Sequence, residues 1–334
     1  MIFVTGGTGL VGSHVLLKLV EKGYLFKALK REKSSLSVCR SVFKYYNQEE
    51  SFLKINWVNG DITDIISLEE LIVDCDQILH CAAAVSFNTA DYNLMKKVNV
   101  EGTKNIVNTA LNLGINKLGY VSSIATLGRN STNDTVDEEC HFKFSKKESY
   151  YAVSKYYAEQ EVWRGSQEGL DVIIINPSVI LGPGNWNRGS SQIFKKIFNG
   201  LIFYAPGSTG YVDVVDVSEA LLELFFSDIK NERFILNGKN LSYRECFDRI
   251  ALCLGKKKAT IKVTPFLKSV AWRVEKLRSF FTGNAPLITR ETANSSMRRH
   301  SYSAKKIKNK IGFEFTDIND TIKKYCNWFI SDFQ

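Results

Sequence analysis

The stretch TGGTGLVG, residues 5–12, follows a short apolar run and precedes a pattern typical of an amphipathic helix. Its glycines fit G-x-x-G-x-x-G through Gly6, Gly9 and Gly12, and they also fit G-x-G-x-x-G through Gly7, Gly9 and Gly12. Both patterns meet the same need, because a tight turn lets bare backbone N–H groups approach a pyrophosphate at a helix N-terminus. A turn with a structural role alone is the alternative, but the position between strand and helix favours a dinucleotide-binding turn.

The first 180 residues alternate short β-branched or apolar runs with longer helical patterns. Strands are predicted at 2–6, 25–30, 55–61, 77–83, 117–123 and 171–177. Helices are predicted at 11–23, 67–75, 95–114 and 149–160. Alternation at this spacing is typical of an α/β protein with a Rossmann-type, doubly wound parallel sheet.

The rhythm changes after Pro177. A turn-rich loop, GPGNWNRGSS, leads into shorter elements, and from about residue 240 the chain reads as mostly helical and basic. We therefore expect a dinucleotide-binding domain at 1–176 and a smaller, mostly helical C-terminal substrate lobe at 177–334. A strand-and-helix pattern at 211–236 indicates that the chain returns to the sheet there.

The composition excludes several classes of protein. The chain has 334 residues, of which 44% are hydrophobic, enough for a sizeable core. Its seven cysteines form no Cys-x-x-Cys pair, and its four histidines are far apart, so neither a metal site nor a disulfide framework is expected. The chain begins with a strand-like pattern and no apolar run reaches the ~18 residues of a membrane span, so we expect neither a signal peptide nor a membrane-spanning segment. We expect a cytoplasmic location.

The positive charge is concentrated in one region. Residues 256–310 hold fifteen of the Lys and Arg residues but only two acidic ones, within a chain of net charge +9. Nucleic acid, a membrane surface or an anionic substrate could each meet such a region, but we favour a solvated basic face and expect no nucleic acid. The amphipathic stretch 264–281 could lie on a membrane surface. We favour packing on the substrate lobe, where it would help to wall the pocket.

The ends of the second and third strands bear on cofactor choice. A carboxylate at the second strand's tip would bind ribose hydroxyls and favour NAD. Lys30 and Arg31 stand there instead and suit a 2′-phosphate, so NADP is favoured although Glu32 follows. Asp61 could accept a hydrogen bond from an adenine amino group and Ile62 could pack on the ring; a simple turn residue is the alternative for Asp61.

Hydroxyl, phenol and ammonium groups converge on one edge of the predicted sheet. Ser122 and Ser123 end the strand at 117–123, and ligands bind at this edge of open parallel sheets. In SYYAVSKYYAEQ, residues 149–160, Tyr151 and Lys155 are four apart and share a helix face. An amphipathic helix with tyrosines at its rim is the alternative for this stretch.

A series of motifs then occurs in order along the chain: TGGTGLVG, NGDITD, HCAAAVSF, VNVEGTKN, VSSIATLG, YAVSK, NPSVILGPG and YVDVVDV. Together they resemble the extended short-chain dehydrogenase/reductases of the NAD-dependent epimerase/dehydratase family. The resemblance spans nearly the whole chain. HCAAAVSF and NPSVILGPG are most similar to the branch that contains dihydroflavonol 4-reductase and 3β-hydroxysteroid dehydrogenase.

The resemblance implies roles for particular residues. The catalytic tyrosine falls on Tyr151, the lysine on Lys155, and the serine on Ser123 rather than Ser122. Asn99 matches an asparagine that some relatives use in a proton relay, and a buried helix-stabilising amide is the alternative. The residues implied to bind the cofactor are Gly6, Thr8, Gly9, Leu10, Val11, Gly12, Lys30, Arg31, Asp61, Ile62, Ala82, Ala83, Ala84, Tyr151, Lys155, Pro177 and Ser178.

The implied chemistry is hydride transfer between nicotinamide and a carbonyl or alcohol. A free phenol has a pKa of about 10, and a nearby ammonium favours its ionised form. Tyr151 would therefore donate or accept the proton, Ser123 would hold the substrate oxygen, and Lys155 would also bond the nicotinamide ribose. Tyr150, Tyr156 and Tyr157 are interpreted as packing residues.

Sugar-nucleotide epimerases and dehydratases share this machinery and remain the alternative. They usually place an arginine and an asparagine where this chain has Asn176 and Val179, and an arginine where GSTG stands before YVDVVDV. Losing charge-assisted donors should weaken a diphosphate site, although Arg188 or the basic lobe could replace them. We favour a carbonyl reductase or alcohol dehydrogenase that acts on a less polar small molecule.

Two further expectations follow from the resemblance. Some relatives bind NADP only to sense it or to scaffold partners, but they tend to lose the tyrosine or the lysine, and both are present here. A homodimer through helices at 93–113 and 150–165 is also implied.

Overall fold

The computed structural model describes residues 1–128, 135–145, 148–267, 269, 272–273 and 296–333. Most of the amphipathic stretch 264–281 therefore lies outside the described residues, and its interpretation stays a prediction. The described residues form no disulfide bond. Among the helices that the structure describes, none combines the length and the apolar character needed to cross a bilayer.

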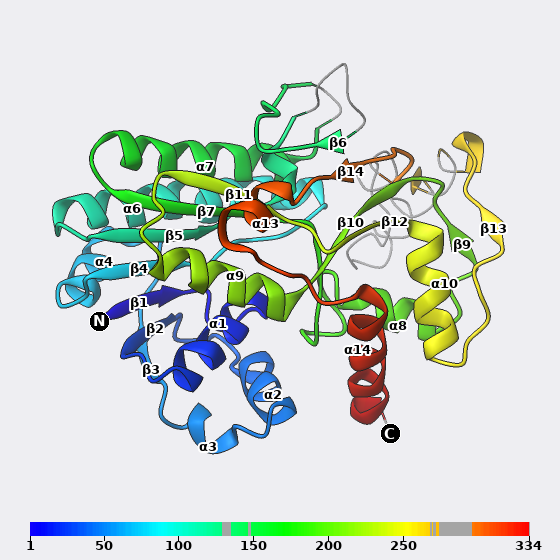
Figure 1. Cartoon of the computed structure of the whole chain (residues 1–334), viewed down its shortest axis with the longest axis horizontal. Coiled ribbons are helices and arrows are strands. Elements are labelled where there is room, and N and C mark those ends of the chain that lie inside the picture. The colour runs from blue at the N-terminus through cyan, green and yellow to red at the C-terminus, as the bar shows by residue number, and fades with distance from the viewer. Residues whose placement is uncertain (129–134, 146–147, 268, 270–271, 274–295, 334) are drawn as a thin grey trace.

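A seven-stranded parallel sheet forms the centre of the molecule (Figure 1). Its strands are β1 (Ile2–Thr5), β2 (Phe26–Lys30), β3 (Asn56–Asn59), β4 (Gln77–His80), β5 (Lys117–Val121), β7 (Asp171–Pro177) and β11 (Glu232–Leu236). Their order is β11-β7-β5-β4-β1-β2-β3, and every neighbouring pair is parallel. The order reverses between β1 and β4, which makes a switch point there. The predicted doubly wound sheet is confirmed.

Helices cover both faces of this sheet, with α6 and α7 on one side and α1 and α9 on the other (Figure 1). The helices up to β11 are α1 (Leu10–Glu21), α2 (Ser37–Tyr45), α3 (Glu49–Phe52), α4 (Ile65–Ile72), α5 (Tyr92–Met95), α6 (Gly102–Asn112), α7 (Tyr150–Gln167), α8 (Gln192–Phe198) and α9 (Val214–Phe226). The single helix predicted at 95–114 is interrupted by a π-helical segment, η2 (Lys96–Glu101). A π-segment leaves backbone hydrogen bonding locally irregular, which a hydrophobic pattern does not reveal.

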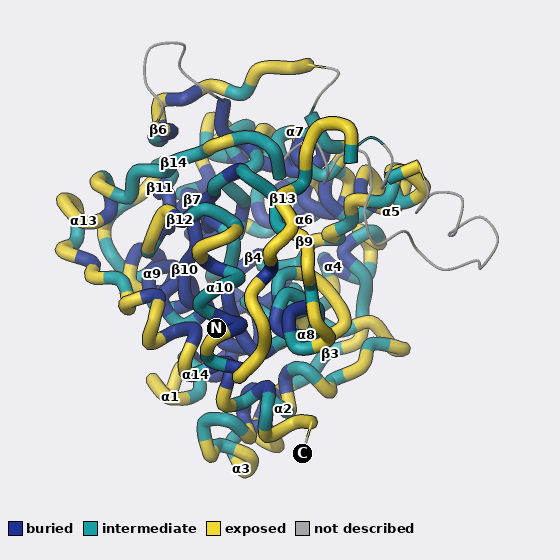
Figure 2. Tube along the Cα trace, turned by 90° about the vertical axis from the view of Figure 1, so that its right-hand side faces the viewer, coloured by how far each residue is buried: buried dark blue, intermediate teal, exposed yellow. Residues whose placement is uncertain are grey.

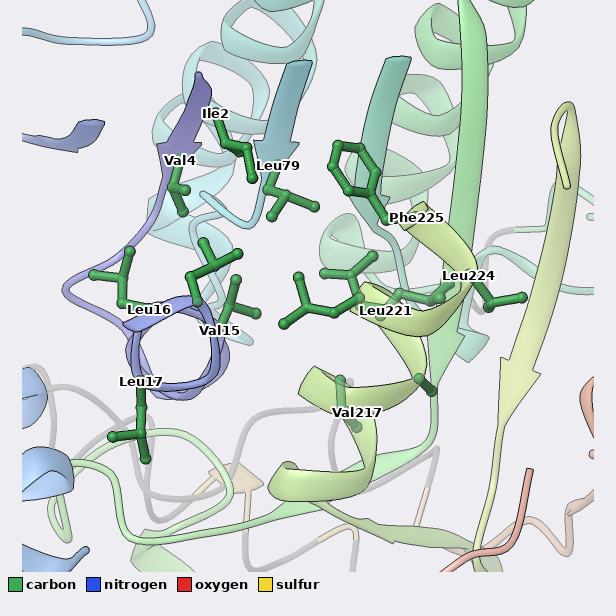
Figure 3. Close-up of a cluster of buried hydrophobic side chains, with 14 of the residues drawn as sticks. Ile2, Val4, Val15, Leu16, Leu17, Leu79, Val217, Leu221, Leu224 and Phe225 are labelled. Atoms are coloured by element: carbon green, nitrogen blue, oxygen red, sulfur yellow. The ribbon is translucent and has the colours of Figure 1, made fainter. Parts of the chain in front are cut away.

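The larger part of the core lies between the sheet and the pair α1 and α9, as Figure 3 shows. Val4 from β1, Leu16 from α1 and Leu221 from α9 are fully buried there, and Phe225 closes the end of the cluster. Burying one such aliphatic side chain stabilises the fold by roughly 1.5–3 kcal/mol. A second cluster lies between the opposite face of the sheet and α4, α6 and α7. Figure 2 shows the buried strands inside and the exposed loops outside.

The smaller lobe is assembled around a second sheet of three strands, in the order β12-β10-β8. Its elements are β8 (Val179–Leu181), α8, β9 (Phe203–Tyr204), β10 (Ser208–Asp213), β12 (Lys239–Ser242), α10 (Tyr243–Cys253), β13 (Ile261–Lys262) and α14 (Ile318–Phe333). The helix α13 (Lys305–Ile311) packs instead on β11 of the main sheet. Asp213 at the end of β10 binds α14, because its carboxylate accepts from Thr321 Oγ1 at 2.9 Å and from the Tyr325 hydroxyl. Between β10 and β12 the chain passes through α9 and β11, so it returns to the main sheet before completing the lobe.

A short parallel pair, β6 (Thr135–Val136) and β14 (Ser301–Tyr302), lies against β10. It joins a segment that follows β5 to one from the C-terminal part of the chain. Both lobes therefore contribute backbone to the region beyond the carboxyl ends of β5 and β7.

Candidate active site

The glycine turn between β1 and α1 is tightly packed. Gly6 adopts φ +73°, and a Cβ there would come within 2.5 Å of the Ala82 backbone nitrogen. A Cβ on Gly12 would come within 2.1 Å of the Gly6 carbonyl oxygen, so α1 can approach the turn only because residue 12 has no side chain. The Gly9 N–H donates to that same oxygen at 2.9 Å and closes the turn.

The N-terminus of α1 opens at the exposed Gly9. A Cβ on Gly9 would meet only the Gly6 oxygen, at 3.4 Å, so the outer side of the turn is open. No acidic side chain lies in the first turn of α1, and no side chain caps it. Its first N–H groups therefore have the geometry and the helix dipole that suit a phosphate. The side chain of Leu10 packs toward Gly182 and Gly184, so its backbone faces the opening.

The end of β2 carries a hollow of about 460 Å³, lined by Arg31, Glu32, Lys33 and Ser34. Lys30 is directed elsewhere, since its Nζ donates to Asn59 Oδ1 at 2.6 Å. Lys33 and Ser34 were not singled out from the sequence. A loop with several cationic side chains gives no spacing that indicates which of them share a hollow.

Asp61 and Ile62 are both held by the protein itself. Asp61 Oδ1 accepts from the backbone N–H and the hydroxyl of Thr63, both at 2.9 Å, which makes it a turn residue in this structure. Ile62 is 6% exposed and its side chain packs on Gly102. Its carbonyl accepts from Asn105 Nδ2 at 3.1 Å. The Ile62 side chain thus belongs to the core between the sheet and α6.

Ser123 and Tyr151 come together at the carboxyl edge of the sheet. Ser123 follows β5 and is partly exposed, and its hydroxyl accepts from the Ala125 N–H at 3.1 Å. Burial raises the pKa of the Tyr151 phenol, and the neighbouring Ser123 side chain acts in the opposite direction. Ser122 points inward and donates to Glu159. Strand alternation explains the difference, since adjacent residues face opposite sides.

Lys155 lies inside the protein, on the side of the sheet covered by α7. The Ser149 side chain caps α7 by accepting from the Ala152 N–H at 3.1 Å, which sets the start of the helix. Lys155 is 1% exposed, and burial lowers its pKa to about 7. Its Nζ donates to the Tyr120 hydroxyl at 2.5 Å and to the Val121 carbonyl at 2.9 Å.

Tyr120 is therefore the direct partner of Lys155, and none of the sequence motifs indicates it. A bond between Lys155 and Tyr151 is not among those formed by the described residues. Strand alternation could have indicated that Tyr120 points inward, because it shares a face of β5 with the inward Ser122 and with Leu118 of the same buried cluster. The Tyr120 ring also lies beneath the ammonium, 4.3 Å from its centroid.

Asn99 connects the segment after β4 to α7. It is 1% exposed; its Oδ1 accepts from the Ala84 N–H at 2.7 Å, and its Nδ2 donates to the Ala84 carbonyl at 3.0 Å and to Ser154 Oγ at 2.9 Å. The Ala82 N–H donates to Thr5 Oγ1 at 3.2 Å, so both ends of the Ala82–Ala84 segment are fixed. The geometry matches the buried, structure-stabilising amide, which was one of the two interpretations of Asn99.

The residues after β7 lie close to this site. Ser178 is 5% exposed, and within the described part of the chain its hydroxyl has no hydrogen-bond partner. Asn176 Nδ2 donates to the Ser123 carbonyl at 3.1 Å and to Glu159 at 2.9 Å, so Asn176 supports the serine segment. Pro177 ends β7 between them.

The other tyrosines of α7 differ in exposure. Tyr156 stacks on Phe142 with ring centroids 4.6 Å apart, as a packing residue. Tyr150 and Tyr157 are 41% and 48% exposed. Tyr157 lines a groove of about 250 Å³ between α5 and α7. In the described ranges, His, Cys, Asp and Glu residues form no group that could hold a metal ion.

Comparisons with known proteins agree with this arrangement. A model of the NAD dependent epimerase/dehydratase family matches residues 2–224. A protein of Synechocystis sp., provisionally named dihydroflavonol 4-reductase, is 29% identical over 336 residues, which cover 98% of this chain and 94% of that protein. Cinnamoyl-CoA reductase 1 of Petunia hybrida is 29% identical over 245 residues, 70% of this chain and 72% of the enzyme. The crystal structure of gox2253 has 29% identity and a TM-score of 0.82, covering 99% of this chain and 98% of that one.

The burial of Lys155 predicts a specific pH dependence of stability in the nucleotide-free protein. Its folded pKa of about 7 lies below the ordinary value of 10.5, so between these values the unfolded state binds the extra proton and stability rises with pH. The free energy of unfolding of the wild type, minus that of Lys155→Met, should rise by up to about 1.4 kcal/mol per pH unit in this range. Urea unfolding at several pH values measures it.

The exposed Lys54 provides the control. The same subtraction with Lys54→Met should be flat with pH. A flat difference for Lys155→Met as well would show that the amine is not buried as described.

Proposed function

This chain belongs to the NAD dependent epimerase/dehydratase family, and on that basis we propose that it reduces a carbonyl group of a small molecule with NADPH. It is an NAD(P)-dependent enzyme of the extended short-chain type, and the direction of the reaction, the cofactor preference and the site residues are our proposal. The observation that carries the proposal is the packing of α7, which carries Tyr151, against the short segment that Ser123 caps at the carboxyl edge of the sheet. Two relatives with reductase names support it.

The glycine turn and the start of α1 fit a dinucleotide. The backbone of Gly9, Leu10 and Val11 would hold the pyrophosphate, since the outer side of Gly9 is open and α1 begins without an acidic residue. Ser178, whose buried hydroxyl lacks a partner among the described residues, would meet a polar group of the nicotinamide half. When bound, the reduced nucleotide supplies a hydride to the carbonyl carbon.

The residues of the chain supply the proton and hold the substrate. The Ser123 hydroxyl would donate a hydrogen bond to the substrate oxygen, and Tyr151 would transfer its phenolic proton to that oxygen as the carbonyl becomes an alcohol. A phenol whose pKa is raised by burial retains its proton at neutral pH, which suits a general acid. The buried Lys155 ammonium, one helical turn away, would stabilise the phenolate left behind.

Epimerase or dehydratase action is the second candidate, because the family includes such enzymes. Asn176, at the position of their arginine, is directed to Ser123 and Glu159 in the interior, so it is not available to a diphosphate. Arg188 is exposed on the loop after β8. The inward direction of Asn176 favours a substrate less polar than a sugar nucleotide, whereas the exposed Arg188 stays available to an anionic one.

Removing the Tyr151 hydroxyl tests the proposed general acid. We expect Tyr151→Phe to lower kcat for carbonyl reduction by about 100-fold or more, because general acid catalysis typically contributes that much. The affinity for NADPH should stay within about twofold of the wild type. Loss of the reduced-nicotinamide absorbance, in a screen of ketones and aldehydes, gives the rate. Tyr150→Phe on the same helix, which removes an exposed phenol, is the matched control. Unchanged turnover or output in Tyr151→Phe would favour a nucleotide sensor or scaffold.

The cationic hollow after β2 tests the cofactor preference. Arg31→Ala should raise the KM for NADPH by roughly tenfold and leave that for NADH unchanged, because a charge-assisted bond to the 2′-phosphate is lost. Lys54→Ala, far from any proposed site, should change neither constant. Equal weakening of both nucleotides would place the effect elsewhere than on the 2′-phosphate.

An exposed aromatic surface supports a homodimer through α5 and α7. Tyr92, Tyr150 and Tyr157 are each more than 40% exposed on these helices, and Phe144 lies beside Tyr157. Light scattering should give the mass of a dimer, and Tyr157→Glu should give a monomer, because a charge would be buried at the interface. A monomeric wild type would exclude this interface.

A further inference from the structure

A buried carboxylate lies one turn beyond Lys155 on α7. Glu159 is 1% exposed and is surrounded by hydrogen-bond donors from three other segments. Its donors are the Ser122 hydroxyl, the Thr126 hydroxyl at 2.7 Å, Asn176 Nδ2 at 2.9 Å and Arg233 Nη1 at 3.1 Å. Burying a charge is costly unless it is paired and hydrogen-bonded, and these four contacts meet that need.

Two of these contacts reach the segment that carries Ser123. Ser122 precedes Ser123 in the chain. Thr126 is the last residue of the short helix that Ser123 caps, and the Thr126 hydroxyl lies 2.9 Å from the Ser123 carbonyl. Glu159 therefore fixes both sides of the serine that meets Tyr151. The hydrogen bonds of Glu159 with Ser122 and Thr126 lie in the interior, so Glu159 does not cover the exposed side of Ser123.

Arg233 of β11 completes the arrangement. Its side chain is 17% exposed, and it pairs with Glu159 while also donating to the Glu138 carbonyl, through Nε at 3.0 Å. The strand β11 is the edge strand of the main sheet, and Arg233 is paired with Ile174 of β7. The arginine therefore comes from a part of the chain that follows residues 1–176. The carboxylate is thus paired with a guanidinium, and Lys155 lies one helical turn before it on α7.

Glu159 and Lys155 are four residues apart on α7, a spacing that places them on one face of the helix. The other titratable groups around the amine are His80 of β4, Cys81 after it, Tyr120 of β5 and Tyr151 of α7. Burial lowers the pKa of His80 to about 3 and raises the pKa of Cys81 to about 12, and it raises those of both phenols, so all four are neutral near pH 7. Within the described part of the chain, Glu159 is left to favour the ammonium form.

We propose that Glu159 and Arg233 act as a pair of positioning residues: Glu159 keeps Lys155 protonated and fixes the segment of Ser123, and Arg233 balances the carboxylate charge. The importance of Lys155 rests on the proposed function, but the pairing itself does not. Opposite changes at the two residues should therefore shift the protonation of Lys155 in opposite directions. A role in packing alone would not give opposite signs.

The test is an NMR titration of Lys155 in nucleotide-free protein labelled with ¹³C-lysine, with Lys155→Met to assign the signal. In Glu159→Gln, the midpoint of Lys155 should fall by roughly one pH unit, because an opposite charge is lost and the guanidinium remains. In Arg233→Gln, it should rise, and in the double variant it should return close to the wild-type value. Glu161→Gln is the matched control, since this partly exposed carboxylate on the same helix pairs with Arg164 and should leave the midpoint unchanged.

Shifts in the same direction in both single variants, or no shift in either, would overturn the proposal. Should Glu159→Gln fail to fold, the upward shift in Arg233→Gln and the value in the double variant still decide the matter. Absence of carbonyl reduction by the wild type would count against the proposed function alone, because the titration uses neither substrate nor nucleotide.

Discussion

The burial of one ammonium group, that of Lys155, constrains the rest of the site. Removing it from water is unfavourable, and the cost is offset by the Tyr120 hydroxyl, the Val121 carbonyl and the charge of Glu159. Those partners lie on β5 and α7. The hydrogen bonds of the Lys155 amine therefore fix the position of α7 relative to β5, and this position places Tyr151 near Ser123.

The second constraint is the close approach of β1, α1 and the segment after β4. Gly6 and Gly12 allow the turn to lie against Ala82 and against itself, and Asn99 ties the same segment to α7. The switch point between β1 and β4 thus lies next to the helix that carries the tyrosine and the lysine. One framework therefore holds the glycine turn, which we propose binds the nucleotide, and the Tyr151 and Ser123 hydroxyls, which we propose act on the substrate.

The sequence predicts the strands, their parallel arrangement and the glycine turn, because these follow from local periodicity and backbone conformation. Choosing Ser123 over Ser122 agrees with the inward direction of Ser122, which strand alternation explains. Contacts between distant segments were beyond reach: Arg233 meets Glu159 across 74 residues, and Tyr120 meets Lys155 across 35. The π-helical turn around Asn99 and the core position of Ile62 likewise depend on tertiary packing.

A crystal structure of the protein with NADP⁺ tests the central claim most directly. The account predicts the pyrophosphate on the turn at Gly9, the 2′-phosphate beside Arg31, and the nicotinamide within reach of the Tyr151 and Ser123 hydroxyls. A nucleotide bound away from the glycine turn, or a Tyr151 side chain directed away from the nicotinamide, would contradict it.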